Sequence, residues 1–121
     1  MRCEVEYTDK FENWWDELNE SEQMSVDSCV ELLERSGATL GYPYSSDIYG
    51  SRHSQMRELR VQHKGRPLRV LYAFDPRRMA ILLIGGDKTG NNRWYEQFVP
   101  IADSLYDEHL RILKKEGSID G

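Results

Sequence analysis

Three extended segments follow one another between residues 56 and 85, separated only by short turns. Lys64-Gly65 forms a two-residue turn between the first two segments. The Asp-Pro-Arg-Arg sequence at 75–78 places proline at the second position of a turn between the last two. Because turns this short join antiparallel neighbours, the region predicts a three-stranded antiparallel meander. The strands read MRELRVQH at 56–63, RPLRVLYAF at 66–74 and MAILLIG at 79–85.

The Lys64-Gly65 turn also fixes the register of the first two strands. With these residues in the turn, His63 faces Arg66, and Arg60 stands directly opposite Arg69. Like charges directly opposite each other destabilise a sheet, so this pair predicts either an anionic ligand or acidic residues donated by another element. The other face of the two strands then carries the core residues Leu59, Val61, Leu68, Val70 and Tyr72.

The segments flanking the meander have the periodicity of one further strand and three helices. Residues 2–7 alternate apolar and acidic side chains, which predicts a short strand. A helix capped by Thr8 or Asp9 and a second helix at 21–36 predict an αα-hairpin lying on the sheet. Residues 93–115 follow a helical period. We therefore expect one α+β domain over residues 1–121, in which an antiparallel sheet of the N-terminal strand and the meander is packed by the hairpin and the C-terminal helix.

Residues 37–55 hold glycine, proline, serine and three tyrosines without periodicity, which predicts a long loop. Loops of this length in a compact domain are often functional. Tyr42, Tyr44 and Tyr49 either stack on the bases of a nucleic acid or pack down as a lid, and the sequence leaves both interpretations open.

The formal net charge of −5 conceals an uneven distribution. Residues 52–94 hold ten basic and three acidic side chains, whereas residues 1–51 hold three basic and twelve acidic ones. A basic segment inside an acidic chain favours a face that binds a polyanion. The alternative is that its arginines pair with the acidic N-terminal third. Asp103 and Asp107, four residues apart in the predicted C-terminal helix, indicate a solvated face rather than an acid–base couple.

The stretch GGDKTGNNRWYEQF at 85–98 joins the last predicted strand to the C-terminal helix. Exposed N–H groups at a helix start favour phosphate, and Lys88 adds a positive charge. Asp87 stands where a Walker A loop has glycine, which argues against nucleoside triphosphates. Lys88, Trp94 and Tyr95 beside the two arginines suit a phosphodiester and a flanking base. In such a site Tyr95 or Lys88 serves as general base, while Arg69 stabilises the charged transition state.

Other chemistries find no support in the sequence. The histidines His53, His63 and His109 lack the spacing of metal ligands. Cys3 and Cys29 match neither a disulfide framework nor a zinc motif, and indicate small buried thiols in a reducing compartment. No apolar run reaches the length of a membrane span, and no signal-peptide pattern is present. We therefore expect a cytoplasmic protein that uses no metal or cofactor and no membrane partner.

The order of strand, two helices, three antiparallel strands and terminal helix resembles the RelE/ParE toxin superfamily. GRPLRVLYAFDPRRMAILLIGGDKTG at 65–90 is similar to its HigB-type, phage Gp49-like branch. That branch has a Gly-Arg-x-x-Arg-x-x-Tyr strand, an apolar strand and a lysine-bearing turn before a helix. RWYEQFVPIADSLYDEHL at 93–110 resembles a common continuation. The resemblance covers most of residues 3–115.

This resemblance implies the toxin of a type II toxin–antitoxin pair, which cleaves mRNA in the ribosomal A site. The implied chemistry is attack of the RNA 2′-OH on its own phosphate, with no metal. Arg69 matches the strand arginine that stabilises the phosphate, Lys88 matches the basic position after the last strand, and Tyr95 lies near the catalytic tyrosine of some members. The implied partner is a cognate antitoxin, a small helix-turn-helix protein, in a toxin–antitoxin hetero-oligomer. The expected RNA-binding residues are Arg57, Arg60, Lys64, Arg66, Arg93 and Trp94.

Two departures keep other functions open. Active members are typically basic overall, and many carry two adjacent basic residues where this chain has Asp87-Lys88. The first alternative is a ParE-like inhibitor of DNA gyrase, which binds through the same fold without RNA chemistry. The second is a catalytically weak homologue that acts mainly through its antitoxin complex.

Overall fold

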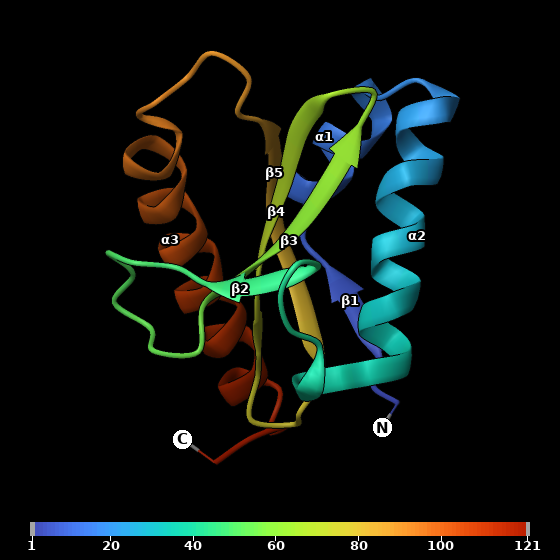
Figure 1. Ribbon diagram of the computed structural model, residues 1–121. Coiled ribbons are helices and arrows are strands. Elements are labelled where there is room, and N and C mark those ends of the chain that lie inside the picture. Colours follow the sequence, from blue (N-terminus) through green and yellow to red (C-terminus); the bar gives the residue numbers. More distant parts are fainter. Residues whose placement is uncertain (1, 121) are drawn as a thin grey trace.

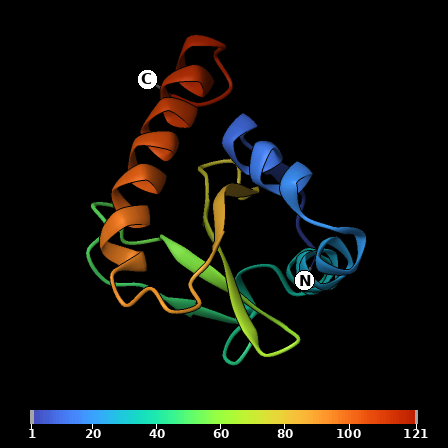
Figure 2. The ribbon, with the colours of Figure 1, turned by 90° about the horizontal axis from the view of Figure 1, so that it is seen from above.

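The computed structural model describes residues 2–120 as a five-stranded sheet with helices on both faces. Figure 1 shows α3 on one side of the sheet and α1 and α2 on the other, and Figure 2 shows the same layers from above. This confirms the α+β class. The elements in chain order are β1 (Val5–Tyr7), α1 (Asp9–Glu17), α2 (Glu20–Ser36), the 3₁₀ turn η1 (Gly37–Thr39), β2 (Ser45–Asp47), β3 (Arg57–His63), β4 (Arg66–Phe74), β5 (Ala80–Asp87) and α3 (Trp94–Lys115).

The predicted meander and its register are confirmed. His63 pairs with Arg66, and Arg60 lies directly opposite Arg69. Lys64 and Gly65 both have positive φ, 50° and 81°, which is the backbone geometry of a type I′ turn and matches the twist of the strands it joins.

Two features of the sheet differ from the expectation. The strand order is β1-β5-β4-β3-β2, and β1 pairs with β5 in parallel, so the sheet is mixed rather than fully antiparallel. The αα-hairpin carries the chain from β1 at one edge of the sheet to β2 at the other edge, and the strands β2 to β5 then lead back to β1. A long crossing of this kind makes the parallel pairing possible. The segment predicted as a loop also contains β2, which pairs antiparallel with β3. Its Ser-Ser-Asp sequence has no apolar alternation that would have revealed a strand.

Strand β5 contains a β-bulge. Leu71 pairs with Ile84 and Tyr72 pairs with Leu82, so Leu83 has no partner on β4. An extra residue of this kind reverses the side of the sheet on which later residues point. Leu83 and Ile84 consequently both pack on the α3 side. The bulge turns Lys88, which follows β5, to that same side, where it lies against the ring of Tyr95 in α3.

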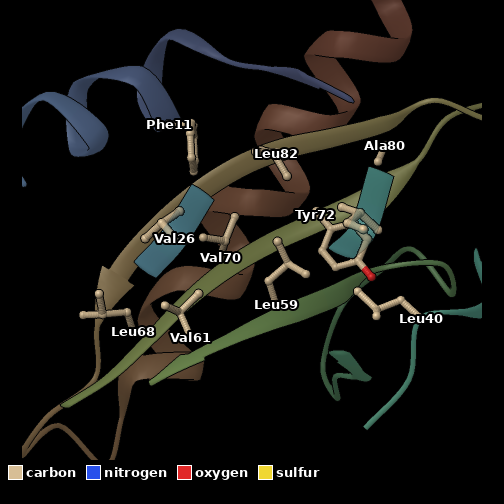
Figure 3. Packing of buried hydrophobic residues seen from close by; sticks show 11 residues of the cluster. Phe11, Val26, Leu40, Leu59, Val61, Leu68, Val70, Tyr72, Ala80 and Leu82 are labelled. Atoms are coloured by element: carbon tan, nitrogen blue, oxygen red, sulfur yellow. The ribbon is translucent and has the colours of Figure 1, made fainter. Parts of the chain in front are cut away.

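A separate hydrophobic core lies on each face of the sheet. The apolar face of β3 and β4 packs against α1 and α2, with Phe11, Val26 and Leu33 contributed by the helices. Figure 3 shows the strand residues of this core facing Phe11 and Val26. On the opposite face Leu71, Ile81 and Leu83 pack against Trp94, Ala102 and Tyr106 of α3. The apolar strand β5 is thus covered on both faces of the sheet.

The helix starts follow local capping rules. The Thr8 side chain accepts a hydrogen bond from the Phe11 N–H at the start of α1. Asn19 and Glu22 form a reciprocal capping box at the start of α2, which satisfies two N–H groups that the helix itself leaves unpaired. Of the two possible starts of the first helix, Thr8 is therefore the cap.

Gly85 and Gly86 mark the places where tryptophans from both layers approach the sheet. A Cβ atom on Gly85 would lie 2.3 Å from the Trp14 ring, and one on Gly86 would lie 2.7 Å from Trp94 Nε1. Distances this short leave no room for a side chain. The glycines of the GGDKTG stretch therefore allow helices to pack against β5.

Candidate functional site

A buried carboxylate, Glu58 on β3, forms the centre of the polar cluster between the sheet and α3. The residue is 3% exposed. Its Oε1 accepts a hydrogen bond of 2.5 Å from the Tyr95 hydroxyl, and its Oε2 accepts one of 2.6 Å from the Ser46 hydroxyl. Arg60 donates to Oε2 through Nη1 at 3.1 Å. Glu58 therefore ties together β2, β3 and α3.

Arg69 lies next to this carboxylate on the neighbouring strand β4, with only 5% of its side chain exposed. Its Nε is 3.6 Å from Glu58 Oε1 and makes no hydrogen bond within residues 2–120. Its Nη1 donates to the Leu68 carbonyl at 3.0 Å. The like-charged pair expected from the register is thus real. The acid that compensates it is Glu58, which comes from the same strand as Arg60 rather than from another element.

Lys88 completes the cluster from the turn that follows β5. Its Nζ lies 3.5 Å from the Tyr95 hydroxyl and 4.8 Å from the centroid of the Tyr95 ring. Burial and the charge of Arg69 lower the pKa of Lys88 from its ordinary value, although Glu58 opposes this shift. Lys88 therefore gives up its proton more readily than a solvated lysine.

The phenol of Tyr95 shifts in the opposite sense. Burial raises the pKa of Tyr95, and its hydrogen bond to the Glu58 carboxylate raises it further, while Arg69 acts against both. A tyrosine of this kind keeps its proton at neutral pH and can donate it. The sequence left Tyr95 and Lys88 as equal candidates for a general base, and their pKa directions favour Lys88.

Four residues that were expected to contact RNA lie outside the cluster. Arg57 is on the other face of β3, where it donates to Asp47 at 2.7 Å and to the Leu40 carbonyl at 3.2 Å. Arg66 pairs with Glu22 of α2 and with Asp87, so part of the basic segment does neutralise the acidic N-terminal third. The other two are Lys64, at the exposed tip of the β3–β4 turn, and Arg93, which pairs with Glu96 at 3.0 Å.

Trp94 requires a correction of a different kind. We expected it beside the RNA, but it is 1% exposed and belongs to the core on the α3 face. Its ring stacks on Phe98 with a centroid distance of 4.5 Å. Gly86 lies against its indole nitrogen. The ring is thus a packing element, and no nucleobase can reach it while α3 stays in place.

Other polar groups on α3 have structural roles. Asp103, expected on a solvated face, is buried and accepts hydrogen bonds from the Ser51 hydroxyl at 2.5 Å and the Arg52 N–H at 3.0 Å. It therefore fastens the segment before β3 to α3. Cys3 and Cys29 are free and half-buried rather than fully buried. Over residues 2–120 no three histidine, cysteine or acidic side chains gather as metal ligands would, and no helix is long and apolar enough to cross a membrane.

Comparison with known proteins identifies the family. Residues 13–107 match the sequence model of the family of phage-derived Gp49-like proteins, and this match spans most of the chain. The chain belongs to the Gp49-like family. Two relatives of this Gp49-like chain in Mycobacterium tuberculosis carry provisional toxin names. HigB3 is 47% identical over 100 residues, which are 82% of this chain and 86% of the relative. HigB2 is 40% identical over 99 residues, which are 80% of this chain but 49% of that longer protein.

A solved structure supports the fold of this Gp49-like chain. A mutant of the Escherichia coli toxin RelE in its free state superposes with a TM-score of 0.58, at 8% identity, over 79% of this chain and 94% of the other. At that identity the likeness concerns the fold alone. The HigB relatives make the chain a HigB-type toxin of the type II toxin–antitoxin class, and the RelE structure adds a RelE-like fold, as the sequence motifs implied.

Sequence reasoning missed Glu58 as a member of the site. The signal was present, because Glu58 and Arg60 are two residues apart in a strand and therefore share a face. The hairpin register that places Arg60 opposite Arg69 also places Glu58 on the arginine face.

Proposed function

We propose that this HigB-type toxin is a metal-independent endoribonuclease that cuts mRNA on the ribosome and so blocks translation. The observation that supports this most strongly is the imbalance of charge around Glu58. Three cationic side chains, Arg60, Arg69 and Lys88, surround one carboxylate. Such a cluster keeps a surplus of positive charge after its internal pairing. An RNA phosphodiester supplies the negative charge that the cluster lacks.

The proposed reaction is an internal phosphoryl transfer. The 2′-oxygen of the RNA attacks the adjacent phosphorus, and the bond from phosphorus to the 5′-oxygen of the next nucleotide breaks. The products are a 2′,3′-cyclic phosphate and a free 5′-hydroxyl. Lys88 in its neutral form accepts the proton of the 2′-OH, and Tyr95 donates a proton to the departing 5′-oxygen. One proton is taken up and one is given, so the reaction balances without a metal or a cofactor.

The arginines act on charge rather than on protons. In this proposal Arg60, with 27% of its side chain exposed, contacts the phosphate, and the more deeply buried Arg69 adds a second positive charge. Charges held in position before the reaction stabilise the transition state without reorganisation. Glu58 holds Arg60 and Tyr95 in place through hydrogen bonds and acts as a positioning residue.

The proposed partners follow from this function. One is mRNA in the ribosome, for which Lys64 on the β3–β4 turn and Arg93 directly before α3 are exposed basic residues. The other is a cognate antitoxin, which we propose to be a small helix-turn-helix protein. Co-expression with the neighbouring open reading frame tests this partner, and a toxin that purifies alone and still arrests growth would contradict it.

The deciding experiment adds purified protein, free of antitoxin, to translating ribosomes with a defined mRNA and maps the new 5′ ends. Wild type is compared with Arg69→Ala and Lys88→Ala, and Lys114→Ala at the exposed end of α3 is the matched control. We expect codon-phased cuts with wild type and Lys114→Ala, and none with the two site variants. Intact mRNA from a folded wild-type protein, with inhibited gyrase supercoiling, would replace the nuclease by a gyrase inhibitor.

A further inference from the structure

One exposed aromatic side chain lies directly against the site. Tyr42, Tyr44 and Tyr49 are 76%, 48% and 96% exposed. Tyr42 differs from the other two because the Arg60 guanidinium lies over its ring, with Cζ 5.1 Å from the ring centroid. Arg60 donates at the same time to Glu58. A single arginine therefore connects the ring of Tyr42 to the carboxylate at the centre of the site.

The backbone that carries Tyr42 is held in place. The Gly41 carbonyl accepts hydrogen bonds from the N–H groups of Tyr44 at 3.0 Å and Ser45 at 3.1 Å. The Tyr44 carbonyl accepts one from the Arg60 N–H at 2.9 Å. From the other face of the sheet, Arg57 donates to the carbonyl of Leu40. The ring is thus presented by an anchored turn, which reduces the entropy that ordering it on binding would cost.

An exposed ring in this position is poorly explained by packing. A tyrosine lid buries its ring against the core, whereas Tyr42 leaves three quarters of its surface in water. The guanidinium covers one face of the ring, and the exposure of Tyr42 leaves the other face open to a flat ligand. Nucleobases stack on aromatic side chains whatever their sequence, because every base has a π-face. The cations around Glu58 would meanwhile hold the phosphate attached to that nucleotide.

We propose that Tyr42 is a stacking platform for a nucleobase next to the scissile phosphate of the RNA. The ligand is a single-stranded RNA segment, and Arg60 links its stacked base to the reacting phosphodiester. This inference rests on the proposed nuclease function for the identity of the reaction. The stacking contact itself can be measured by binding alone.

The test uses the full chain and a short single-stranded RNA with one 2′-deoxy nucleotide at the cleavage position, which prevents the reaction. Binding is measured by fluorescence anisotropy for wild type, Tyr42→Ala, Tyr42→Phe and Tyr49→Ala. Loss of one base–aromatic stack weakens binding by about 5- to 150-fold, so we expect that loss for Tyr42→Ala. Tyr42→Phe keeps the ring and should bind as wild type does. Tyr49→Ala removes a more exposed ring from the same loop without an arginine partner, and should also bind normally.

Each outcome bears on the proposal. Equal binding by Tyr42→Ala and wild type, or no RNA binding by wild type, would overturn it. Equal losses in Tyr42→Phe and Tyr42→Ala would assign the effect to the hydroxyl and would also overturn it. If Tyr42→Ala weakens binding while wild type leaves mRNA intact on ribosomes, the stacking site stands and the nuclease function fails. Thermal unfolding of each variant shows that the fold is retained, as expected for exposed positions.

Discussion

Replacing Glu58 by glutamine tests the central feature of the site, because the change removes one charge and almost no volume. Glu58 and Arg69 have 4% and 5% of their side chains exposed, and the two groups approach to 3.6 Å. Two unit charges about 4 Å apart attract by about 4 kcal/mol at an effective dielectric constant of about 20. Removing one partner of a buried pair typically costs about 3–5 kcal/mol, because the other charge remains buried and uncompensated. We therefore expect Glu58→Gln to lose about 3 kcal/mol of unfolding free energy.

Urea unfolding at pH 7 measures this loss. Glu96→Gln is the matched control, since Glu96 and its partner Arg93 are 68% and 71% exposed. It should change the unfolding free energy by less than about 1 kcal/mol. The double variant Glu58→Gln/Arg69→Met removes both buried charges and should recover much of the loss, giving a coupling of roughly 1–3 kcal/mol. If Glu58→Gln unfolds at the same urea concentration as wild type, Arg69 does not depend on this carboxylate and the reasoning is wrong.

Three further predictions follow from the same contacts. Burial and the charge of Arg69 lower the pKa of Lys88. The rate of RNA cleavage should therefore rise with pH, with a midpoint below pH 10.5. A Lys88→Arg variant whose cleavage rate rises in the same way would exclude Lys88 as the general base. Gly86→Ala brings a Cβ to 2.7 Å from Trp94 and should lower the unfolding free energy in urea by about 1–3 kcal/mol. Gly41→Ala meets nothing closer than 4.0 Å, so its unfolding free energy should stay within about 1 kcal/mol of wild type. Similar losses of unfolding free energy in the two variants would contradict the packing argument. Burial alone would raise the pKa of Asp75, but its hydrogen bonds from an arginine and a histidine outweigh that effect and lower the pKa. The stability that this carboxylate provides is therefore present at neutral pH and lost as pH falls below about 3.8. Urea unfolding should separate Asp75→Asn from wild type at pH 7 and not at the acid end, and an equal difference in unfolding free energy at both pH values would refute this.

The meander could be read from the sequence because each of its signals is local. The Lys64-Gly65 turn sets the hairpin register, and that register places Arg60 opposite Arg69. The apolar run of β5 indicates cover on both faces, and the two cores provide it. These features depend on residues that are neighbours in the chain or across one tight turn.

The features that sequence reasoning missed depend on contacts between distant segments. Strand β2 has three polar residues and forms because β3 offers it an open edge. The parallel pairing of β1 with β5 depends on how the αα-hairpin returns to the sheet. Trp94 looked like a ligand platform because of its place beside a lysine-bearing turn, yet the glycine opposite it gives the ring a place in the core.

The unpaired Leu83 acts as a phase shift within β5. Before it, the residues of β5 that face α3 have odd numbers, as Ile81 does, and after it they have even numbers, as Gly86 does. A related chain of the same length with no bulge in this strand would turn its lysine away from the arginines, unless that lysine stood one place earlier or later in the sequence. Two such chains can therefore hold their cations in the same positions in space although their lysines do not align. A one-residue gap near this strand is best interpreted as a change of phase, and the basic residue should then be assigned by the face of the sheet on which it lies.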